Sequence, residues 1–312
     1  MIDCDVHNEV PGWRTLAPYL DDYWRETLEQ GDFKGPPATH ALPSDPPPVG
    51  LDDVRRDVLT RAETAILNCT YGAASIYNPY AAAAMAAAVN DWQIAEWLDR
   101  EPRLRASIVV PAGQPAMAAA EIDRVGDHPG FVQVILPVRS AIPYGNPICW
   151  PIFEAAERHD LAICLHAGGM PGNPPTGTGW PSYYVEQVVG MPGAFQAQLI
   201  SLVSEGVFAR FENLRVVLAE SGFAWLAPFL WRVDKEWKGL RRETPWTSRS
   251  YTEIVAERVS ITLQPVDCPP ERLDAVLDRL PGEMLMNASD YPHIHADPPD
   301  GLDAARLDKT AK

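Results

Sequence analysis

Histidine and carboxylate side chains stand where several short apolar stretches of the sequence end. The first stretch ends in Asp5 and His7, and later ones end in His166, Glu220 and Asp290. Residues two apart in a β-strand point to the same side, so Asp5 and His7 can face one site together. Neutral imidazole and carboxylate oxygen are ligands for divalent cations such as Zn²⁺, Mn²⁺ and Fe²⁺. We therefore predict that Asp5, His7, His166 and Asp290 bind one divalent metal ion, with Zn²⁺ the first choice.

The same residues could activate a water molecule. A bound cation makes a water lose its proton more easily than in bulk solvent. Asp290 or Glu220 would accept that proton, and the hydroxide would attack a carbonyl that the metal ion polarises. Asp290, Glu220 and His166 are therefore the candidate catalytic residues. The leading hypothesis is a metal-dependent hydrolase of a small cyclic or aromatic ester, lactone or amide.

Four further residues are candidates for binding a small-molecule substrate. Trp180 and Tyr184 belong to a long stretch, 168–184, and could wall a pocket for a flat ring, because aromatic side chains combine a large face with a polar tip. Arg139 could bind a substrate carboxylate through two hydrogen bonds. His293 follows the last apolar stretch closely and could contact the substrate. For Trp180, Tyr184 and Arg139, packing between loops and neighbouring subunits is the alternative interpretation. For His293 the alternatives are a partner of a metal ligand and a histidine that caps a loop.

These side chains need a fold that gathers the ends of the apolar stretches. The stretches are mostly apolar on both faces, which is typical of parallel strands covered by helices. We predict strands at 2–7, 64–71, 105–111, 131–137, 161–166, 214–220, 259–265 and 283–290. Amphipathic helices are expected between them, at 80–100, 115–127, 151–159, 193–211, 224–237 and 269–280.

Eight alternating units in this length favour a (β/α)₈ barrel, which places its active site at the carboxyl ends of the strands. A doubly wound sheet is the alternative, but the glycine fingerprint expected after its first strand is missing. Two long stretches, 35–50 after strand 1 and 168–184 after strand 5, would distort the barrel, and loops of that length are commonly functional. Residues 1–312 then form one domain. Since Asp290 lies 22 residues before Lys312, the eighth helix must be short or truncated.

Composition narrows the choice of partners. The chain of 312 residues is 46% hydrophobic, with 26 basic against 42 acidic residues and a formal charge of −16. This charge argues against nucleic acid as a partner. No stretch is long and apolar enough for a membrane span, and the N-terminus lacks the features of a secretory signal, so we expect a cytoplasmic protein. Trp231 and Trp237 on one predicted helix suggest an apolar outer surface and a homodimer, with inward packing of the two rings on neighbouring elements as the alternative.

The sequence also resembles a known family. It is similar to the amidohydrolase superfamily, in particular to the amidohydrolase-related group that includes aminocarboxymuconate semialdehyde decarboxylase and resorcylate-type decarboxylases. The resemblance implies a distorted (β/α)₈ barrel with one divalent metal at its mouth, held by Asp5, His7, His166 and Asp290. Four motifs carry it: the strand 1 motif around Asp5 and His7, His166-Ala167-Gly168-Gly169, Glu220-Ser221-Gly222 with Trp225, Pro228 and Arg232, and Ser289-Asp290-Tyr291-Pro292-His293.

The chain departs from the family pattern at three places. At the first ligand position, Asp5 is shorter than the His or Glu that is common in the family. The family members with two metal ions bridge them with a Lys in strand 4. No Lys stands near Gln133 in this chain, so a binuclear site is not expected. The decarboxylases carry a catalytic His after strand 6, where this chain has Glu220. That difference favours the hydrolase, whereas the family favours a metal-dependent non-oxidative decarboxylase, in which Arg139 anchors an aromatic or unsaturated acid and Asp290 protonates it. A metal-free barrel that only binds a ligand is the third hypothesis.

Overall fold

Eight parallel strands lie in sequential order in the computed structural model, which describes residues 1–36, 47–169 and 173–293. Every strand pairs in parallel with the next one along the chain. The strands are β1 (Ile2–Val6), β2 (Thr64–Leu67), β3 (Leu104–Val109), β4 (Phe131–Arg139), β5 (Ala162–Gly169), β6 (Val216–Ala219), β7 (Val259–Thr262) and β8 (Leu285–Met286). The predicted barrel is thus confirmed, and the doubly wound alternative is wrong, because the strand order never reverses.

Backbone hydrogen bonds between the two ends of the sheet nearly close the barrel. The N–H of Cys4 donates to the carbonyl of Asn287 at 2.8 Å, and the N–H of His7 donates to that of Tyr291 at 2.8 Å. Between these contacts the segment after β8 bends at Asp290, where φ is +55°. This bend explains why β8 has two residues instead of the eight predicted for 283–290.

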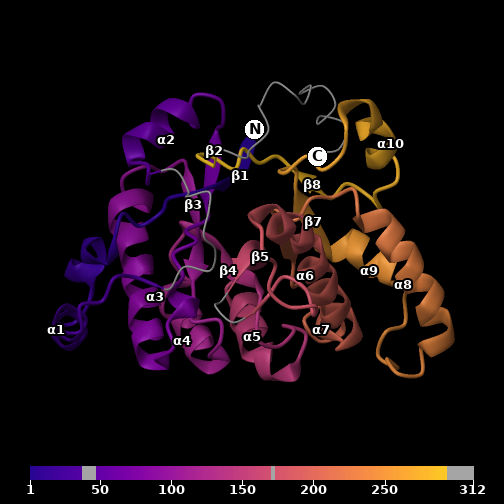
Figure 1. Cartoon of the computed structure of the whole chain (residues 1–312), viewed down its shortest axis with the longest axis horizontal. Coiled ribbons are helices and arrows are strands. Elements are labelled where there is room, and N and C mark those ends of the chain that lie inside the picture. Colours follow the sequence, from indigo (N-terminus) through magenta and orange to yellow (C-terminus); the bar gives the residue numbers. More distant parts are fainter. Residues whose placement is uncertain (37–46, 170–172, 294–312) are drawn as a thin grey trace.

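Helices cover the outside of the barrel (Figure 1). Each predicted helix is present with shifted bounds, whereas α1, α2 and α9 were not predicted. For α9 the sequence does carry a signal, because Ser250 and Glu253 form a capping box. The helices are α1 (Asp22–Gln30), α2 (Leu51–Asp57), α3 (Pro79–Gln93) with a π-helical turn (Ile94–Leu98), α4 (Pro115–Val125), α5 (Trp150–Arg158), α6 (Tyr184–Ser204), α7 (Val207–Arg210), α8 (Leu226–Leu240), α9 (Tyr251–Arg258) and α10 (Leu273–Leu277).

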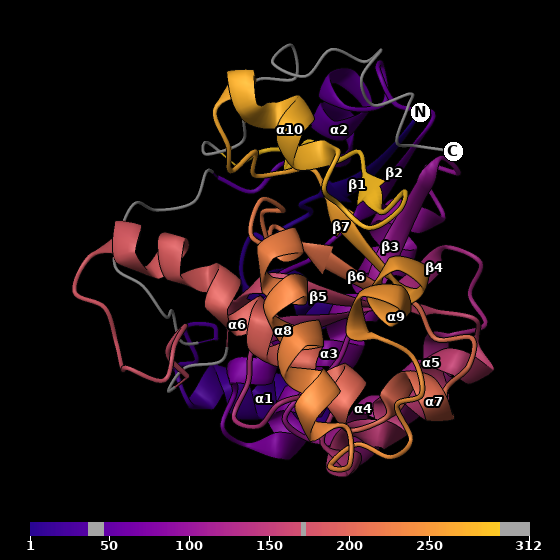
Figure 2. The same cartoon turned by 90° about the vertical axis from the view of Figure 1, so that its right-hand side faces the viewer.

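Helix α6 begins nine residues earlier than the predicted 193–211. Glu186 in its first turn accepts the backbone N–H groups of Ser182 and Tyr183 at 3.1 and 2.8 Å, which fixes this early start. The first turns of α6 project from the rest of the molecule (Figure 2). The predicted long loop after strand 5 is present as the segment between β5 and α6, except that residues 170–172 lie outside the described residues. Most of the other long stretch (37–46) and the predicted short eighth helix (294–312) also lie outside them.

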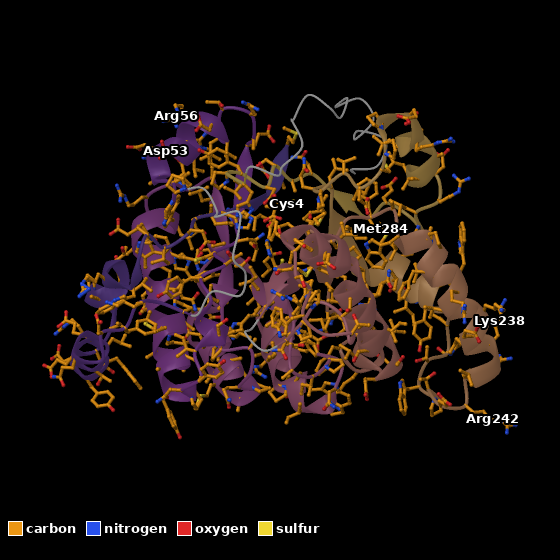
Figure 3. All side chains as sticks on the ribbon, in the orientation of Figure 1. Cys4, Asp53, Arg56, Lys238, Arg242 and Met284 are labelled. Atoms are coloured by element: carbon orange, nitrogen blue, oxygen red, sulfur yellow. The ribbon has the colours of Figure 1, made fainter. Side chains whose placement is uncertain are left out.

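Most of the barrel wall consists of buried apolar side chains. All four residues of β6 are buried, and Ile108, Leu165 and Leu218 are fully buried. Figure 3 shows Asp53, Arg56, Lys238 and Arg242 at the periphery of the molecule, whereas Cys4 and Met284 lie within it. On the outside of α8 Trp231 is exposed while Trp237 packs against the core, so the predicted dimer interface stays a prediction. Among the described residues no helix is long and apolar enough to cross a membrane.

A buried carboxylate fastens α2 to the barrel. Glu101 is 8% exposed and accepts hydrogen bonds from Arg55 of α2 at 3.0 Å and from Arg103 at 2.9 Å. Burial opposes ionisation, but Arg103 and Arg55 outweigh it and hold the pKa of Glu101 at about 2. The carboxylate therefore stabilises the fold while it is ionised. This stabilisation is present above the ordinary pKa of 4.5 and is lost as the pH falls towards 2.

We predict that Glu101→Gln lowers the free energy of unfolding at pH 7 by about 1–3 kcal/mol, because charged hydrogen bonds to two arginines are lost. The difference from the wild type should shrink between pH 4.5 and 2, measured by urea denaturation at each pH. Asp52→Asn is the matched control, since Asp52 contacts the same Arg55 at 3.0 Å but is 93% exposed. It should cost about 0.5 kcal/mol. Equal losses for the two variants would contradict this assignment.

Candidate metal centre

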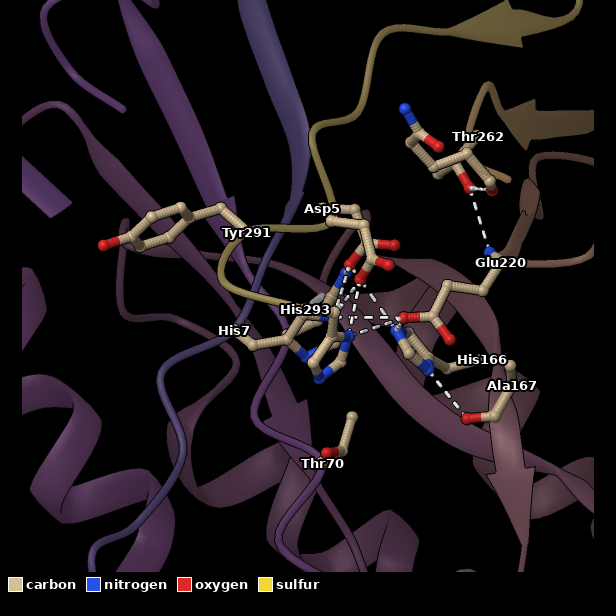
Figure 4. Close-up of polar contacts among 12 residues, drawn as sticks. Asp5, His7, Thr70, His166, Ala167, Glu220, Thr262, Tyr291 and His293 are labelled. Atoms are coloured by element: carbon tan, nitrogen blue, oxygen red, sulfur yellow. Dashed lines mark hydrogen bonds and ion pairs between the residues drawn. The ribbon is translucent and has the colours of Figure 1, made fainter. Parts of the chain in front are cut away.

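Six of the predicted site residues, His293 among them, meet at the carboxyl ends of the strands (Figure 4). Asp5 and His7 come from the end of β1, His166 from β5, Glu220 follows β6, and Asp290 follows β8. Asp5, His7 and His166 are 0–2% exposed, and Asp290 is 8% exposed. The rule that polar residues at strand ends gather in a barrel therefore places these side chains correctly.

Two of these carboxylates stand on unusual backbone conformations. Glu220 and Asp290 both have φ of +55°, a region that residues with a Cβ adopt rarely and at some energetic cost. Each conformation is held by a hydrogen bond. The N–H of Glu220 donates to Oγ1 of Thr262 at 3.0 Å, and the N–H of Asp290 donates to the carbonyl of Asp5 at 3.0 Å. The chain therefore turns sharply after β6 and β8 to direct both carboxylates at the histidines.

His7 Nε2 lies at the centre of the cluster. It is 3.1 Å from Asp290 Oδ1, 3.2 Å from Glu220 Oε1 and 3.5 Å from Asp5 Oδ1. His166 Nε2 lies 3.5 Å from Asp5 Oδ1 and 3.6 Å from Glu220 Oε1. These atoms form two overlapping groups of candidate ligands, each within 4.8 Å: Asp5, His7, His166 and Glu220, and His7, Glu220, Asp290 and His293.

The hydrogen bonding of His166 leaves a nitrogen lone pair directed at the carboxylates. Its Nδ1 donates to the carbonyl of Ala167 at 2.8 Å, so Nε2 carries no proton in the neutral ring. Among the described residues, His166 Nε2, Asp5 Oδ2 and His7 Nδ1 are buried without a hydrogen-bond partner. A neutral nitrogen and carboxylate oxygens that face one another repel unless a proton or a metal cation lies between them. The residues therefore fit a divalent metal ion.

The pKa shifts of the clustered residues also fit a bound cation. Burial alone would lower the pKa of His166, but the Glu220 and Asp5 carboxylates raise it to about 9. Burial likewise opposes the charge on Glu220, yet the neighbouring imidazoles hold its pKa well below its usual value. Asp290 behaves differently, since burial and the charge of Glu220 raise its pKa. Protons and a metal ion therefore compete for the same imidazole nitrogens, as is usual for His ligands.

His293 is paired with Asp290 rather than with the cavity. Its Nδ1 lies 2.7 Å from Asp290 Oδ1, and its ring lies against that of His7 with centroids 4.1 Å apart. Burial would lower the pKa of His293, but Asp290 and Glu220 raise it to about 10. At this distance one proton lies in the hydrogen bond between Asp290 Oδ1 and His293 Nδ1. Tyr291, between them in sequence, points away and donates to Asp57 of α2 at 2.8 Å (Figure 4).

A chain of buried amide and hydroxyl groups supports Asp5 from inside the barrel. Asn68 at the end of β2 donates to Asp5 Oδ1 at 2.8 Å. The oxygen of Asn68 accepts from Gln133 at 3.0 Å and from the hydroxyl of Ser107, and Gln133 also donates to Ser107 at 2.9 Å. Asp5, Asn68 and Ser107 are completely buried, and Gln133 nearly so. Sequence reasoning missed Asn68, although it too follows an apolar stretch.

A cavity that is open to solvent, with about 490 Å³ of empty space including its mouth, lies beside the cluster. It lies at the ends of β2 to β5, with His166 at its inner side, and most of its wall is apolar. Tyr71 lines it, and its hydroxyl is buried without a partner within the described part of the chain. Its lining residues are Cys69, Thr70, Tyr71, Gly72, Ala74, Ser75, Val109, Val110, Ile135, Pro137, His166, Ala167 and Gly168.

The structure places three of the predicted substrate-binding residues around the segment after β5. The guanidinium of Arg139 is buried, donates to the carbonyls of Gly168 and Asn173 at 3.1 and 3.3 Å, and lies 5.5 Å from the ring centre of Trp180. Trp180 is 48% exposed, and Tyr184 is the first residue of α6. These three are absent from the cavity lining given above, so their contact with a substrate stays a prediction.

Comparison with known proteins gives one family and several decarboxylases. A family model described as amidohydrolase matches residues 2–311. The chain is 25% identical over 228 residues to the gamma-resorcylate decarboxylase of Polaromonas sp.. The aligned region covers 67% of this chain and 66% of that protein. It is 34% identical over 77 residues to the 2-amino-3-carboxymuconate-6-semialdehyde decarboxylase of Dictyostelium discoideum, 25% of this chain and 20% of that one. The match thus spans less than two thirds of each relative.

Solved structures support the fold. The 5-carboxyvanillate decarboxylase of Novosphingobium aromaticivorans, solved with bound manganese, superposes with a TM-score of 0.72 at 17% identity, covering 99% of this chain and 93% of that one. The leading hydrolase hypothesis is therefore wrong: the named relatives are decarboxylases. The hydrolase hypothesis took a metal site with carboxylates as evidence for water activation. Such a site can equally bind the carboxylate of a substrate acid. The preference for Zn²⁺ also finds no support, since the similar structure holds manganese.

We predict that Asn68→Ala lowers the affinity for Mn²⁺ about tenfold to a hundredfold, because a residue that orients a metal ligand is removed. Ser107→Ala is the control, since Ser107 lies one hydrogen bond further from Asp5 and should have a smaller effect. Isothermal titration calorimetry on both purified variants measures this difference. An unchanged affinity in Asn68→Ala would show that Asp5 needs no such support.

Proposed function

This chain belongs to the amidohydrolase family, and we propose that it is a metal-dependent non-oxidative decarboxylase of a small aromatic acid. The observation that carries the proposal is the position of the apolar cavity directly beside the buried cluster of carboxylates and imidazoles, with His166 common to both. A flat ring fits the cavity while its carboxylate reaches the cluster. The decarboxylases among the relatives supply the reaction class.

We propose Mn²⁺ as the metal ion. Asp5, His7 and His166 would hold it together with a further carboxylate from Glu220 or Asp290. A set in which carboxylate oxygens equal or outnumber imidazoles suits Mn²⁺, and manganese is the ion bound in the similar decarboxylase. When bound, the cation would supply a positive charge that attracts the substrate carboxylate and acts as a Lewis acid.

The remaining chemistry needs one proton. The ring carbon that bears the carboxylate takes a proton from the pair of Asp290 and His293, which shares one at Oδ1 and Nδ1. The bond between this carbon and the carboxylate then breaks, its electron pair restores the aromatic ring, and CO₂ leaves. Solvent returns a proton to the pair. In total, the reaction consumes one acid anion and one proton and releases one CO₂ and one arene.

The cavity wall orients the ring. Val109, Val110 and Ile135 present apolar surface to its faces, which favours an aromatic ring over a charged chain. Asn68 and the groups behind it hold Asp5 in place while the substrate binds. Arg139 donates to the carbonyls of Gly168 and Asn173, so we assign it to joining these two residues rather than to binding the reacting carboxylate.

We predict that the Mn²⁺-loaded protein releases CO₂ from one or more hydroxylated benzoic acids and releases no acid from aromatic lactones or esters. A panel of both substrate classes, followed by CO₂ detection and by pH-stat titration, measures the two reactions in parallel. Chelation should lower CO₂ release at least a hundredfold, with recovery on adding Mn²⁺. Acid release from lactones without CO₂ from any benzoic acid would refute the proposed reaction.

We predict that Tyr71→Phe raises KM about tenfold for acids with a hydrogen-bond acceptor on the ring edge remote from the carboxylate, because one hydrogen bond from a buried hydroxyl is lost. Burial raises the pKa of Tyr71, so the hydroxyl stays protonated and can donate. Acids without that acceptor should keep their KM. Tyr77→Phe is the matched control, since Tyr77 is 84% exposed. An equal effect on both kinds of acid would exclude this contact.

A further inference from the structure

Asp3 is a buried carboxylate that neither the candidate metal site nor the proposed reaction uses. It belongs to β1, two residues before Asp5, and is only 5% exposed. Its Oδ1 accepts the backbone N–H of Ser289 at 2.9 Å, and among the described residues no lysine, arginine or histidine forms an ion pair with it. Burying a carboxylate without a counter-charge costs free energy. Its contact with Ser289 therefore indicates what the Asp3 side chain contributes.

The segment after β8 contains one more residue than the part of β1 that it faces. In a parallel ladder, a residue whose N–H donates to residue j−1 lies opposite residue j, and its carbonyl accepts from residue j+1. The N–H of Cys4 donates to Asn287 at 2.8 Å, so Cys4 lies opposite Ala288. Val6 pairs with Tyr291. Two steps along β1 thus face three steps along the other segment, which is a β-bulge.

The Asp3 side chain takes over a hydrogen bond that regular pairing would give to the backbone. With Cys4 in this register, the N–H of Ser289 would donate to the carbonyl of Cys4. It donates to the Asp3 carboxylate instead. The Cys4 carbonyl lies 3.5 Å from the side-chain amide of Asn68. Asp3 therefore holds Ser289 away from the ladder at the point where the extra residue enters.

The bulge directs the Asp290 carboxylate. Asp290 follows Ser289 immediately, has φ of +55°, and donates its N–H to the carbonyl of Asp5 at 3.0 Å. Its Oδ1 consequently lies 3.1 Å from Nε2 of His7. Bulges next to active sites commonly redirect one side chain in this way. Without the extra residue, every side chain after Ser289 would move to the neighbouring position of the ladder, and Asp290 would point elsewhere.

We propose that Asp3 is a positioning residue, whose carboxylate keeps the bulge open and so directs Asp290 to the metal site. This role needs an oxygen atom at one place rather than a negative charge, because an amide oxygen accepts an N–H as well. The consequence for metal binding rests on the proposed function, whereas the effect of Asp3 on the bulge concerns this chain alone.

The first experiment compares Asp3→Asn, which keeps an oxygen and removes the charge, with Asp3→Ala, which removes the acceptor. Mn²⁺ is titrated into each full-length variant without substrate, and the free ion is measured by its electron paramagnetic resonance signal. We expect Asp3→Ala to weaken Mn²⁺ binding about tenfold to a hundredfold and Asp3→Asn to keep it within about threefold. Glu101→Gln is the matched control, since Glu101 is also a buried carboxylate but precedes β3, at the opposite end of the barrel. It should keep its Mn²⁺ affinity despite its lower stability.

The second experiment needs no metal ion. Hydrogen exchange of the segment 287–293, followed by mass spectrometry in the metal-free protein, reports on the bulge directly. Asp3→Ala should speed exchange there about tenfold, while Asp3→Asn and Glu101→Gln should leave it unchanged. If thermal melting shows that Asp3→Ala does not fold, Asp3→Ser replaces it, because the serine hydroxyl is one bond shorter than the carboxylate.

Three results would overturn the proposal: unchanged exchange in Asp3→Ala, equal losses of Mn²⁺ affinity in Asp3→Asn and Asp3→Ala, or an equal loss in Glu101→Gln. The second would show that the charge matters and not the position, and the third that general stability is responsible. If the wild type binds no Mn²⁺ and releases no CO₂ from any acid, the proposed function fails. The exchange measurement alone then decides the role of Asp3.

Discussion

Negative charge concentrated in a closed interior is the constraint on which the rest of this structure depends. The carboxylates of Asp5, Glu220 and Asp290 all lie 3.1–3.5 Å from one nitrogen, Nε2 of His7. Like charges this close repel strongly where water is excluded, so the arrangement requires positive charge, either as protons on the imidazoles or as a metal ion. The raised pKa of His166 expresses that requirement.

Barrel closure and the cation site depend on each other. The hydrogen bond from Asp290 N–H to the Asp5 carbonyl joins the end of the last strand to the first, and the same bond brings the Asp290 carboxylate to His7. The segment after β8 consequently leaves regular strand geometry and takes a left-handed turn. A cation that binds the carboxylates at this seam would therefore also hold the two ends of the sheet together.

The two halves of the barrel mouth have different roles. The carboxylates and imidazoles that could bind a metal ion come from β1, β5 and the turns after β6 and β8. The ends of β2 to β5 form the apolar cavity. Asn68 and the groups behind it lie at the border and hold Asp5 by hydrogen bonds instead of charge. In the proposed function, this division would give a bound acid one orientation, with its carboxylate at the cluster and its ring over Val109 and Ile135.

Much of this could be predicted from the sequence, because apolar stretches buried on both faces define parallel strands and polar residues at their ends gather at the mouth. The buried amide chain through Asn68 was missed, since an Asn at a strand end is common and its partners lie on other strands. The orientation of the Arg139 side chain depends on backbone carbonyls of a loop, and backbone carbonyls leave no pattern in the sequence. Hydrolysis was inferred wrongly because Asp5, His7 and His166 suit either reaction, and the choice depends on what the cavity beside them binds.

We propose that a divalent cation binds within this cluster of carboxylates and imidazoles. An anomalous difference map, recorded near the manganese absorption edge from crystals grown with Mn²⁺, tests it most directly. We expect one strong peak about 2.1 Å from the Nε2 atoms of His7 and His166 and from a carboxylate oxygen of Asp5. Well-ordered crystals without a peak at this position, or with a peak only elsewhere, would contradict it.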